Sequence, residues 1–328
     1  MINRRFRLAA RPVGAPKPSD WTYEEVPVEP PGPGQLLVGV EYVSLDPAMR
    51  GWMNAGKSYV PPVELGEVMR AGGCGRVLAS NHPKFAVGDA VVGLFGVQSH
   101  AVSDGKGVER VDAVAPITLG TLGMTGYTAY FGLLDVGKPV AGDTVVVSGA
   151  AGAVGMIVGQ LAKLHGCRAV GIAGGPDKCK FLTETLGFDA AVDYRDPGFA
   201  EALRAATPTG VNVYFDNVGG DVLDAVLARL ARGARVVICG AISQYNAETR
   251  PKGPSNYLSL LVNRATMQGM VVFDYAPRYA EARAALAGWL AEGKLVDRQQ
   301  VVEGLETFPD RLAMLFRGEN TGKLVLKV

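Results

Sequence analysis

Residues 144–165 read TVVVSGAAGAVGMIVGQLAKLH. The run 144–148 has the uninterrupted apolar character of a buried strand, and from 154 to 165 the apolar residues recur at helical spacing. Between the two, 148–155 reads SGAAGAVG, with its glycines spaced G-x-x-G-x-x-G. A strand, a glycine turn and a helix in this order predict a dinucleotide site, because small residues let the backbone approach a pyrophosphate at the helix N-terminus.

The alternation of strand-like and helix-like segments continues after this turn. Strands are expected at 168–172, 190–192, 211–215 and 236–239, and helices at 178–186, 199–206, 222–230 and 279–292. This βαβαβ rhythm is typical of parallel strands joined by crossover helices. It predicts an α/β fold with a doubly wound parallel sheet of the Rossmann type.

Residues 20–120 differ, because Pro and Gly separate short β-type runs at 35–42, 75–78 and 90–95. Such runs predict a β-rich domain. A helix-compatible stretch at 121–136 separates these β-type runs from the alternating strand-like and helix-like segments, and 323–328 (KLVLKV) is expected to be a closing strand. A chain of 328 residues suggests two domains. We expect 1–122 plus 308–328 to form the β-rich substrate domain and 123–307 the dinucleotide-binding domain.

Composition and charge exclude several classes of protein. The 33 basic and 32 acidic side chains give a net charge of +1, so neither nucleic acid nor an anionic membrane is an expected partner. No apolar stretch reaches the roughly 18 residues of a membrane span. The N-terminus lacks the apolar core of a signal peptide. The four cysteines are dispersed, which favours reduced thiols over a disulfide scaffold or a structural zinc. A cytoplasmic protein is expected.

The choice between NAD and NADP depends on the end of the second strand. An NAD site places Asp or Glu there, about 20 residues after the glycines. In this chain 171–176 reads GIAGGP and holds no carboxylate, and Asp177 and Lys178 follow. A cation near the adenosine ribose favours a 2′-phosphate. NADP is therefore the predicted cofactor, and Lys178 is predicted to face its 2′-phosphate.

Seven segments together resemble a known family. They are 43–53 (VSLDPAMRGWM), 122–130 (LGMTGYTAY), 146–163 (VVSGAAGAVGMIVGQLAK), 214–220 (YFDNVGG), 237–246 (VICGAISQYN), 267–272 (MQGMVV) and 318–324 (GENTGKL). They are similar to segments of the zinc-independent medium-chain dehydrogenases/reductases, in the group of NADPH-dependent double-bond reductases that includes leukotriene/prostaglandin, alkenal and curcumin reductases. The resemblance implies a GroES-like β-rich domain, a homodimer, and NADPH-dependent reduction of the C=C bond of α,β-unsaturated ketones or aldehydes.

The resemblance also implies that no metal takes part. Zinc-dependent relatives carry a G-H-E signature, whereas this chain reads LGE at 65–67, and near their first cysteine ligand it reads LDP at 45–47. The three histidines, His82, His100 and His165, form no ligand-spaced set with a cysteine.

Particular residues acquire roles from the same resemblance. The glycine turn would face the pyrophosphate, Tyr194 the adenosine phosphate, and residues after later strands the nicotinamide half. The implied cofactor-binding residues are Gly149, Gly152, Ala153, Val154, Gly155, Lys178, Tyr194, Asn217, Cys239, Tyr245, Met270, Val272 and Asn320. The implied substrate pocket, between the domains, includes Met49, Arg50, Met124 and Tyr127. Arg50 has two interpretations, attraction of a substrate carboxylate or an ion pair with Asp46, and the ion pair is favoured.

Conjugate reduction needs a hydrogen-bond donor for the negative charge that develops on the carbonyl oxygen, and a proton for the α-carbon. The tyrosine that some relatives carry six residues ahead of the Gln of the MQG segment is Val262 here. The candidate donors are Tyr245, Tyr257 and the 2′-hydroxyl of the cofactor ribose. Two other functions stay open, an NADPH:quinone reductase and a non-enzymatic NADPH-binding sensor, and the SQYN and GENTGK segments favour the double-bond reductase.

Overall fold

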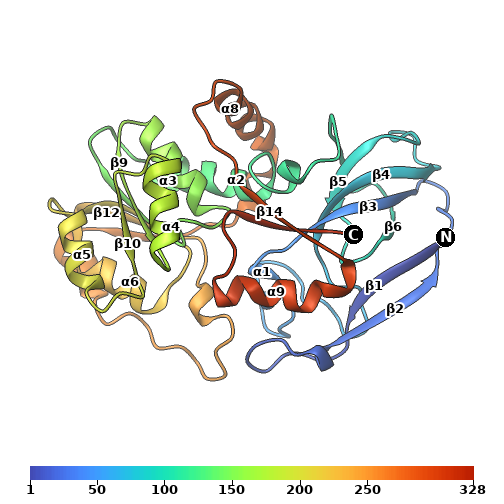
Figure 1. Ribbon diagram of the computed structural model, residues 1–328, viewed down its shortest axis with the longest axis horizontal. Helices are drawn as coiled ribbons and strands as arrows, with labels where there is room; N and C mark the ends of the chain where they lie inside the picture. The colour runs from blue at the N-terminus through green and yellow to red at the C-terminus, as the bar shows by residue number, and fades with distance from the viewer. The chain divides into compact units, whose positions relative to one another are not determined.

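The computed structural model describes all 328 residues, and they form two compact units. The first unit comprises Met1–Gly120 and Gln299–Val328, and the second comprises Thr121–Arg298. Strands dominate the first unit, whereas strands and helices alternate in the second (Figure 1). None of the helices is long and apolar enough to cross a membrane.

The second unit is built on a six-stranded parallel sheet with the order β10-β9-β8-β11-β12-β13. Its strands are β8 (Thr144–Ser148), β9 (Arg168–Ala173), β10 (Ala190–Asp193), β11 (Val211–Asp216), β12 (Leu230–Ile238) and β13 (Thr266–Gly269). Its α-helices are α2 (Met124–Phe131), α3 (Gly155–Leu164), α4 (Pro176–Lys180), α5 (Phe199–Ala206), α6 (Gly220–Leu227), α7 (Leu258–Asn263) and α8 (Tyr279–Ala291). Tighter or wider turns form η3 (Gly132–Gly137), η4 (Phe181–Thr185), η5 (Ile242–Gln244) and η6 (Val272–Arg278). The predicted doubly wound sheet is confirmed.

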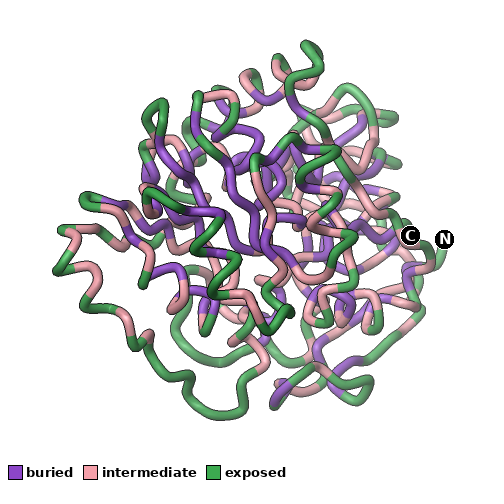
Figure 2. Tube along the Cα trace, turned by 60° about the vertical axis from the view of Figure 1, so that its left-hand side comes forward, coloured by how far each residue is buried: buried purple, intermediate pink, exposed green.

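Both faces of this sheet are covered, which explains the apolar run at its centre. Successive side chains of a strand point to opposite faces. Val145 and Val147 accordingly pack into the apolar cluster that includes α3, whereas Val146 packs into the cluster that includes α5 and α6. All five residues of β8 are buried, as expected of a central parallel strand. In Figure 2 such buried stretches are purple, and the exposed connections are green.

The first unit contains a two-stranded sheet, β1-β2, and a seven-stranded sheet ordered β14-β15-β3-β4-β5-β7, with β6 paired to β3. Its strands are β1 (Ile2–Leu8), β2 (Trp21–Pro27), β3 (Leu36–Ser44), β4 (Gly72–Ser80), β5 (Ala90–Leu94), β6 (His100–Ser103), β7 (Glu109–Arg110), β14 (Gln299–Glu303) and β15 (Lys323–Lys327). Its helical segments are η1 (Pro18–Asp20), α1 (Ala48–Trp52), η2 (Pro116–Leu119), η7 (Leu305–Thr307) and α9 (Phe308–Arg317). The chain returns to this unit at Gln299 rather than at 308, because β14 pairs along β15.

Three helical stretches expected from the sequence differ in the structure. The expected helix 178–186 begins at Pro176 as α4 and continues as the π-helical η4 to Thr185. The expected helix 222–230 ends as α6 at Leu227, and Leu230 already begins β12. The exposed Arg232 and Gly233 interrupt the apolar pattern there, so the early part of this strand carries no strand-like run. The stretch 121–136 forms α2 and then widens into the π-helical η3, in which the missing side chain of Gly132 leaves room for the ring of Phe215.

Candidate functional site

The second unit gathers its predicted cofactor residues at one edge of its sheet. In a parallel sheet the carboxyl ends of all strands meet at the same edge, and ligands bind in the crevice outside it. The glycine turn follows β8, Tyr194 follows β10, Asn217 follows β11, Cys239 follows β12 and Met270 follows β13. Strand order reverses at β8, whose neighbours are β9 and β11. We call this edge the carboxyl edge.

Each glycine of the turn meets a different steric requirement. Gly149 has a φ of +59°, which L side chains rarely adopt. A Cβ on Gly155 would lie 2.4 Å from the carbonyl oxygen of Gly149 and 2.7 Å from Cα of Ala150, so α3 packs directly on the turn. A Cβ on Gly152 would meet only the Gly149 oxygen, at 3.2 Å. Gly152 therefore leaves an open approach to the backbone, whereas the other two shape the turn.

The turn leaves hydrogen-bond donors at the start of α3. Gly152 N–H donates to Gly149 O at 2.9 Å, and Met156 N–H donates to Gly152 O at 3.0 Å. Neither Ala153 nor Val154 donates its N–H to another residue of the turn or of α3, and no side chain caps the helix. Unused N–H groups at a helix N-terminus, with the positive end of its dipole, form a suitable site for a phosphate group.

A buried polar network joins β8 to β11 at the reversal of strand order. Asp216, almost wholly buried, accepts hydrogen bonds through Oδ1 from the hydroxyls of Ser148 (2.9 Å) and Tyr214 (2.7 Å) and from two N–H groups of the following turn. Asn217 donates its backbone N–H to the Ser148 hydroxyl and its side-chain amide to the Ser148 carbonyl oxygen. These bonds hold Asn217 against the glycine turn. Ser148 and Asp216 were not predicted as site residues, although both lie inside the sequence motifs that predict the site.

The loop after β12 brings Cys239 and Tyr245 to the same edge. Cys239 N–H donates to the backbone oxygen of Asp216, and burial together with the negative charge of Asp216 raises the pKa of the Cys239 thiol to about 12. Tyr245 folds back on this loop, where its hydroxyl accepts the N–H of Ala241 at 3.1 Å. A Cβ added to Gly240 would lie 3.0 Å from the Tyr245 hydroxyl, so glycine at this position lets the hydroxyl approach the loop closely. The thiol is therefore neutral, and Tyr245 is fixed on the same loop.

Met270 and Val272 follow β13 and pack, with Cys239, against the apolar cluster that includes α3. Val272 is held by the Tyr279 hydroxyl, which donates to its carbonyl oxygen at 3.0 Å. Tyr257, by contrast, precedes α7 with 58% of its surface exposed. The structure thus places Tyr245 on the loop that follows Cys239 at the carboxyl edge, whereas Tyr257 lies at the start of α7.

Past β9 and β10 lie the residues predicted for the adenosine end. Lys178 sits in α4, and burial together with the nearby positive charge of Arg195 lowers its pKa. Tyr194 lies against Gly174, where an added Cβ would be 3.0 Å from its hydroxyl. Asp193 accepts the N–H groups of Gly175 and Arg195, each at 2.9 Å. Arg195 was not predicted, because its neighbourhood arises only when β9 and β10 pair.

Of the predicted substrate-pocket residues in the second unit, Tyr127 is buried and Met124 is exposed. The Tyr127 hydroxyl donates to Leu122 O at 2.9 Å and accepts from Arg283 Nε at 2.7 Å. Its ring packs on Tyr279, with centroids 4.8 Å apart. The role of these residues toward a substrate stays a prediction.

The favoured ion pair between Arg50 and Asp46 is wrong. In the first unit Arg50 is buried, and its guanidinium donates to the backbone oxygens of Pro12 and Gly14 and to the side chain of Asn54. Asp46 instead pairs with Lys323, whose Nζ lies 2.7 Å from Oδ1. The buried ammonium group of Lys323 supplies the positive charge that pairs with Asp46. The hydrogen bonds of Arg50 instead hold α1 against the N-terminal loop.

Met49 is wholly buried in the apolar cluster of the first unit, and its role toward a substrate stays a prediction. Asn320 also lies in the first unit and donates its amide to Gly322 O at 3.1 Å.

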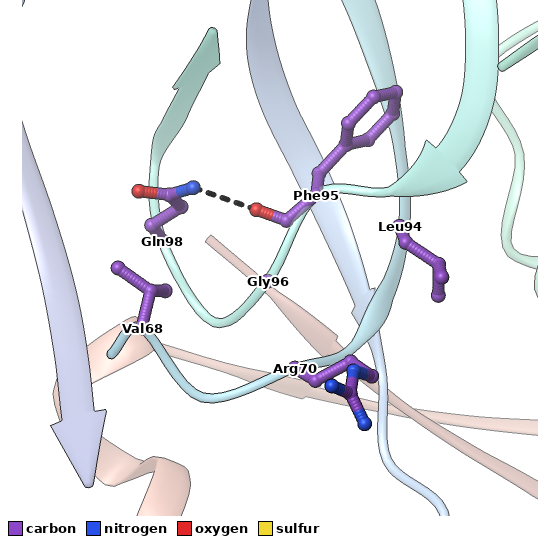
Figure 3. Close-up of a pocket in the computed structure, with 6 residues that line it drawn as sticks. All are labelled: Val68, Arg70, Leu94, Phe95, Gly96 and Gln98. Atoms are coloured by element: carbon purple, nitrogen blue, oxygen red, sulfur yellow. Dashed lines mark hydrogen bonds between the residues drawn. The ribbon is translucent and has the colours of Figure 1, made fainter. Parts of the chain in front are cut away.

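The first unit also contains a hollow of about 260 Å³, lined by Val68, Arg70, Leu94, Phe95, Gly96 and Gln98 (Figure 3). The amide of Gln98 donates to Phe95 O at 2.7 Å and accepts from the Asn3 side chain at 3.0 Å. Arg70 donates to Pro61 O at 2.8 Å. The polar groups of this hollow are thus bound within the chain, and none of the predicted residues lines it. No three His, Cys, Asp or Glu side chains lie close enough together to hold a metal ion.

The residues at the carboxyl edge fit NADP. The open approach at Gly152 and the N–H groups of Ala153 and Val154 at the start of α3 suit a pyrophosphate, and two neighbouring cations, Lys178 and Arg195, suit a 2′-phosphate. No acidic residue occupies the end of β9, where an NAD site would have one.

Comparison with known proteins agrees with this geometry. One family profile, described as the N-terminal domain of oxidoreductase, matches residues 4–111, and another, described as zinc-binding dehydrogenase, matches residues 153–288. The chain is 44% identical to the NADPH-dependent curcumin reductase of Escherichia coli (strain K12), covering 99% of this chain and 97% of that one. It is 39% identical to prostaglandin reductase 1 of Sus scrofa, covering 96% of each. A solved structure of CurA from Vibrio vulnificus in complex with NADPH is similar, with a TM-score of 0.95, 46% identity and 99% of each chain covered.

Proposed function

Because this chain belongs to the NADPH-dependent double-bond reductases of the medium-chain dehydrogenase/reductase superfamily, we propose that it reduces the C=C bond of α,β-unsaturated ketones and aldehydes. The observation that supports this function most directly is the arrangement at the carboxyl edge. A glycine turn open at Gly152 and two cations, Lys178 and Arg195, lie at this same edge of the sheet. The second unit carries this edge.

NADPH, when bound, supplies the hydride that adds to the β-carbon. The protein's part is to bind and orient. The turn and the N-terminus of α3 hold the pyrophosphate, and Asn217, fixed by Ser148, lies at the crevice between β8 and β11. Cys239, Met270 and Val272 form an apolar lining for the nicotinamide half. A neutral thiol at Cys239 suits that position, since a thiolate would attack electrophilic substrates.

Tyr245 is better placed than Tyr257 to donate a hydrogen bond to the developing oxyanion or to order the cofactor ribose. Its hydroxyl already accepts Ala241 N–H, so its own proton is directed away from that bond. We expect Tyr245→Phe to lower kcat for an enone and Tyr257→Phe to leave it unchanged. Unchanged turnover in both variants would exclude both tyrosines and assign the donor role to the ribose 2′-hydroxyl.

The proposed function is tested by following NADPH consumption with a medium-chain 2-alkenal or enone, with NADH and a benzoquinone in parallel reactions. Rapid loss of NADPH with the enone, and slow loss of NADH, is the expected result. Turnover of the quinone alone would move the chain to the quinone reductases. NADPH binding without turnover of either compound would indicate a sensor.

We also propose a homodimer formed along β13. This strand is the edge of the parallel sheet, and an unpaired edge is a ready site for a second strand. Large apolar side chains are exposed on and around the adjoining α7, including Leu261 at 75% and Val262 at 64% of their surface. A second copy related by a two-fold axis would cover both features. Leu261→Glu is expected to give monomers by light scattering, and a dimer unchanged by this substitution would refute the interface.

We propose the cytoplasm as the location of the protein. All four cysteines are free thiols, which suits a reducing compartment. Fractionation of the native cells, with detection of the chain in the soluble cytoplasmic fraction, tests this proposal.

A further inference from the structure

Arg195 lies beside Tyr194 and Lys178 at the end of β10. Its guanidinium stands over the Tyr194 ring, with Cζ 5.7 Å from the ring centroid. A Cβ added to Gly174 would lie 2.9 Å from Arg195 Nε and 3.0 Å from the Tyr194 hydroxyl. The glycine turn after β9 and the Tyr-Arg pair after β10 are therefore in direct contact, and Gly174 is the residue that permits it.

Backbone hydrogen bonds hold this arrangement. Tyr194 N–H donates to Ala173 O at 3.1 Å, which continues the pairing of β9 with β10 by one residue. The Asp193 carboxylate then accepts N–H groups from both turns, that of Gly175 and that of Arg195, and these bonds lower its pKa. Asp193 thus ties the two turns together through the backbone of Arg195, so the direction in which this residue leaves the sheet is fixed.

Lys178 and Arg195 place two positive charges at the same site. The charge of Arg195 is close enough to lower the pKa of Lys178, in addition to the effect of burial. The Asp193 carboxylate also lies near Arg195, whose charge contributes to lowering the pKa of Asp193. A phosphate monoester carries about −1.5 to −2 charges at neutral pH and offers three acceptor oxygens. These oxygens suit N–H donors from both Lys178 and Arg195.

We propose that Arg195 is a specificity-determining residue for the cofactor, and that it binds the 2′-phosphate of NADPH together with Lys178 while the Tyr194 ring supports its guanidinium. The inference rests on the proposed function and deepens it. A planar guanidinium offers paired N–H donors that match phosphate oxygens, and stacking on an aromatic ring limits the conformations it must lose on binding.

Calorimetric titration of the full chain tests the proposal without requiring turnover. The variants are Arg195→Gln and, as a matched control, Arg204→Gln, which removes an exposed arginine of α5 in the same unit. The ligands are two pairs that differ by the 2′-phosphate, namely NADPH with NADH, and adenosine 2′,5′-bisphosphate with adenosine 5′-monophosphate. Arg195→Gln is expected to weaken binding of both phosphorylated ligands about tenfold, because a charge-assisted hydrogen bond is lost. Binding of the other two ligands, and all binding by the control, should be unchanged.

Equal weakening within each ligand pair, or no weakening at all, would overturn the role of Arg195. Arg195→Lys is the second variant, should Arg195→Gln not fold. It keeps the charge but loses the paired N–H donors and the contact with the Tyr194 ring, so it is expected to bind NADPH about threefold more weakly than the original protein, with NADH binding unchanged. Equal weakening of NADPH and NADH binding in this variant would refute the role at the 2′-phosphate. A chain that prefers NADPH to NADH and keeps this preference in Arg195→Gln refutes only the inference, whereas a chain that binds neither cofactor refutes the proposed function.

Discussion

Alanine substitutions at two glycines of the same turn should have different effects. Gly155→Ala should lower the free energy of unfolding, whereas Gly152→Ala should weaken NADPH binding. In Gly155→Ala the new methyl carbon would stand 2.4 Å from the Gly149 oxygen and 2.7 Å from Cα of Ala150, both backbone atoms. Neither can move unless α3 shifts away from the turn. Overpacking of this kind costs about 1–3 kcal/mol, and the better helix propensity of alanine returns up to about 1 kcal/mol. We expect a loss of about 1–2 kcal/mol.

Gly152→Ala should behave differently, because its methyl carbon would meet only the Gly149 oxygen, at 3.2 Å, and the backbone φ lies outside the left-handed region. A shift of a few tenths of an ångström relieves that contact. The free energy of unfolding should therefore change by less than about 0.5 kcal/mol. The same methyl group stands where a pyrophosphate must approach the backbone, and the loss of one charge-assisted hydrogen bond weakens NADPH binding about 10- to 100-fold.

Urea unfolding of the free protein and fluorescence titration with NADPH measure the two effects independently. Gly288→Ala is the control, because this exposed residue of α8 has no atom within 4 Å of the added methyl carbon. It should leave binding unchanged and stability equal or slightly higher. Equal destabilisation by Gly152→Ala and Gly155→Ala, or full NADPH affinity in Gly152→Ala, would refute this division of roles within the turn.

Three further outcomes are expected. Tyr214→Phe removes one donor from the buried Asp216 carboxylate and should lower the free energy of unfolding by about 1.5–3 kcal/mol in urea; an unchanged value would contradict the network. Lys323→Met leaves Asp46 without its cation and should cost about 3 kcal/mol, part of which Asp46→Asn in the same chain should restore. NADPH affinity should decline at a lower pH than a lysine of pKa 10.5 predicts, since the pKa of Lys178 is lowered and its charge is lost as pH rises through that value. NADH affinity should stay level over the same range.

Sequence patterns predicted the second unit well because its strands are buried on both faces. Such strands are continuous apolar runs, and β8 begins and ends at the residues expected from its sequence. In the first unit the pattern is weaker. β1 reads INRRFRL and pairs its arginines with the acidic residues of β2, so neither strand shows an apolar run. The amphipathic α9 carries charges on one face, and it too was not predicted.

The glycine motif identified Gly152 and Gly155, because the atoms that these glycines contact lie only a few residues away in the chain. They could not identify the partner of Asp46. The ammonium group that pairs with it comes from Lys323, in β15, which lies beside β3 only after the chain has returned from the second unit. Closeness in the sequence favoured Arg50 as the partner of Asp46. That prediction is wrong because the guanidinium of Arg50 is buried and donates to the backbone oxygens of Pro12 and Gly14.

Arg195 shows what strand register adds to a motif. Asp193 of β10 pairs with Ala173 of β9, so the residues that follow them, Tyr194 and Gly174, must leave the sheet side by side. The absence of a carboxylate after β9 argues only that a 2′-phosphate is tolerated. The register favours binding of this phosphate, because it places a second cation, Arg195, near the turn that precedes Lys178. Residues at the ends of two neighbouring parallel strands therefore determine the preference for NADPH together. Because the two cations share one phosphate, substituting either residue alone underestimates their joint contribution to that preference.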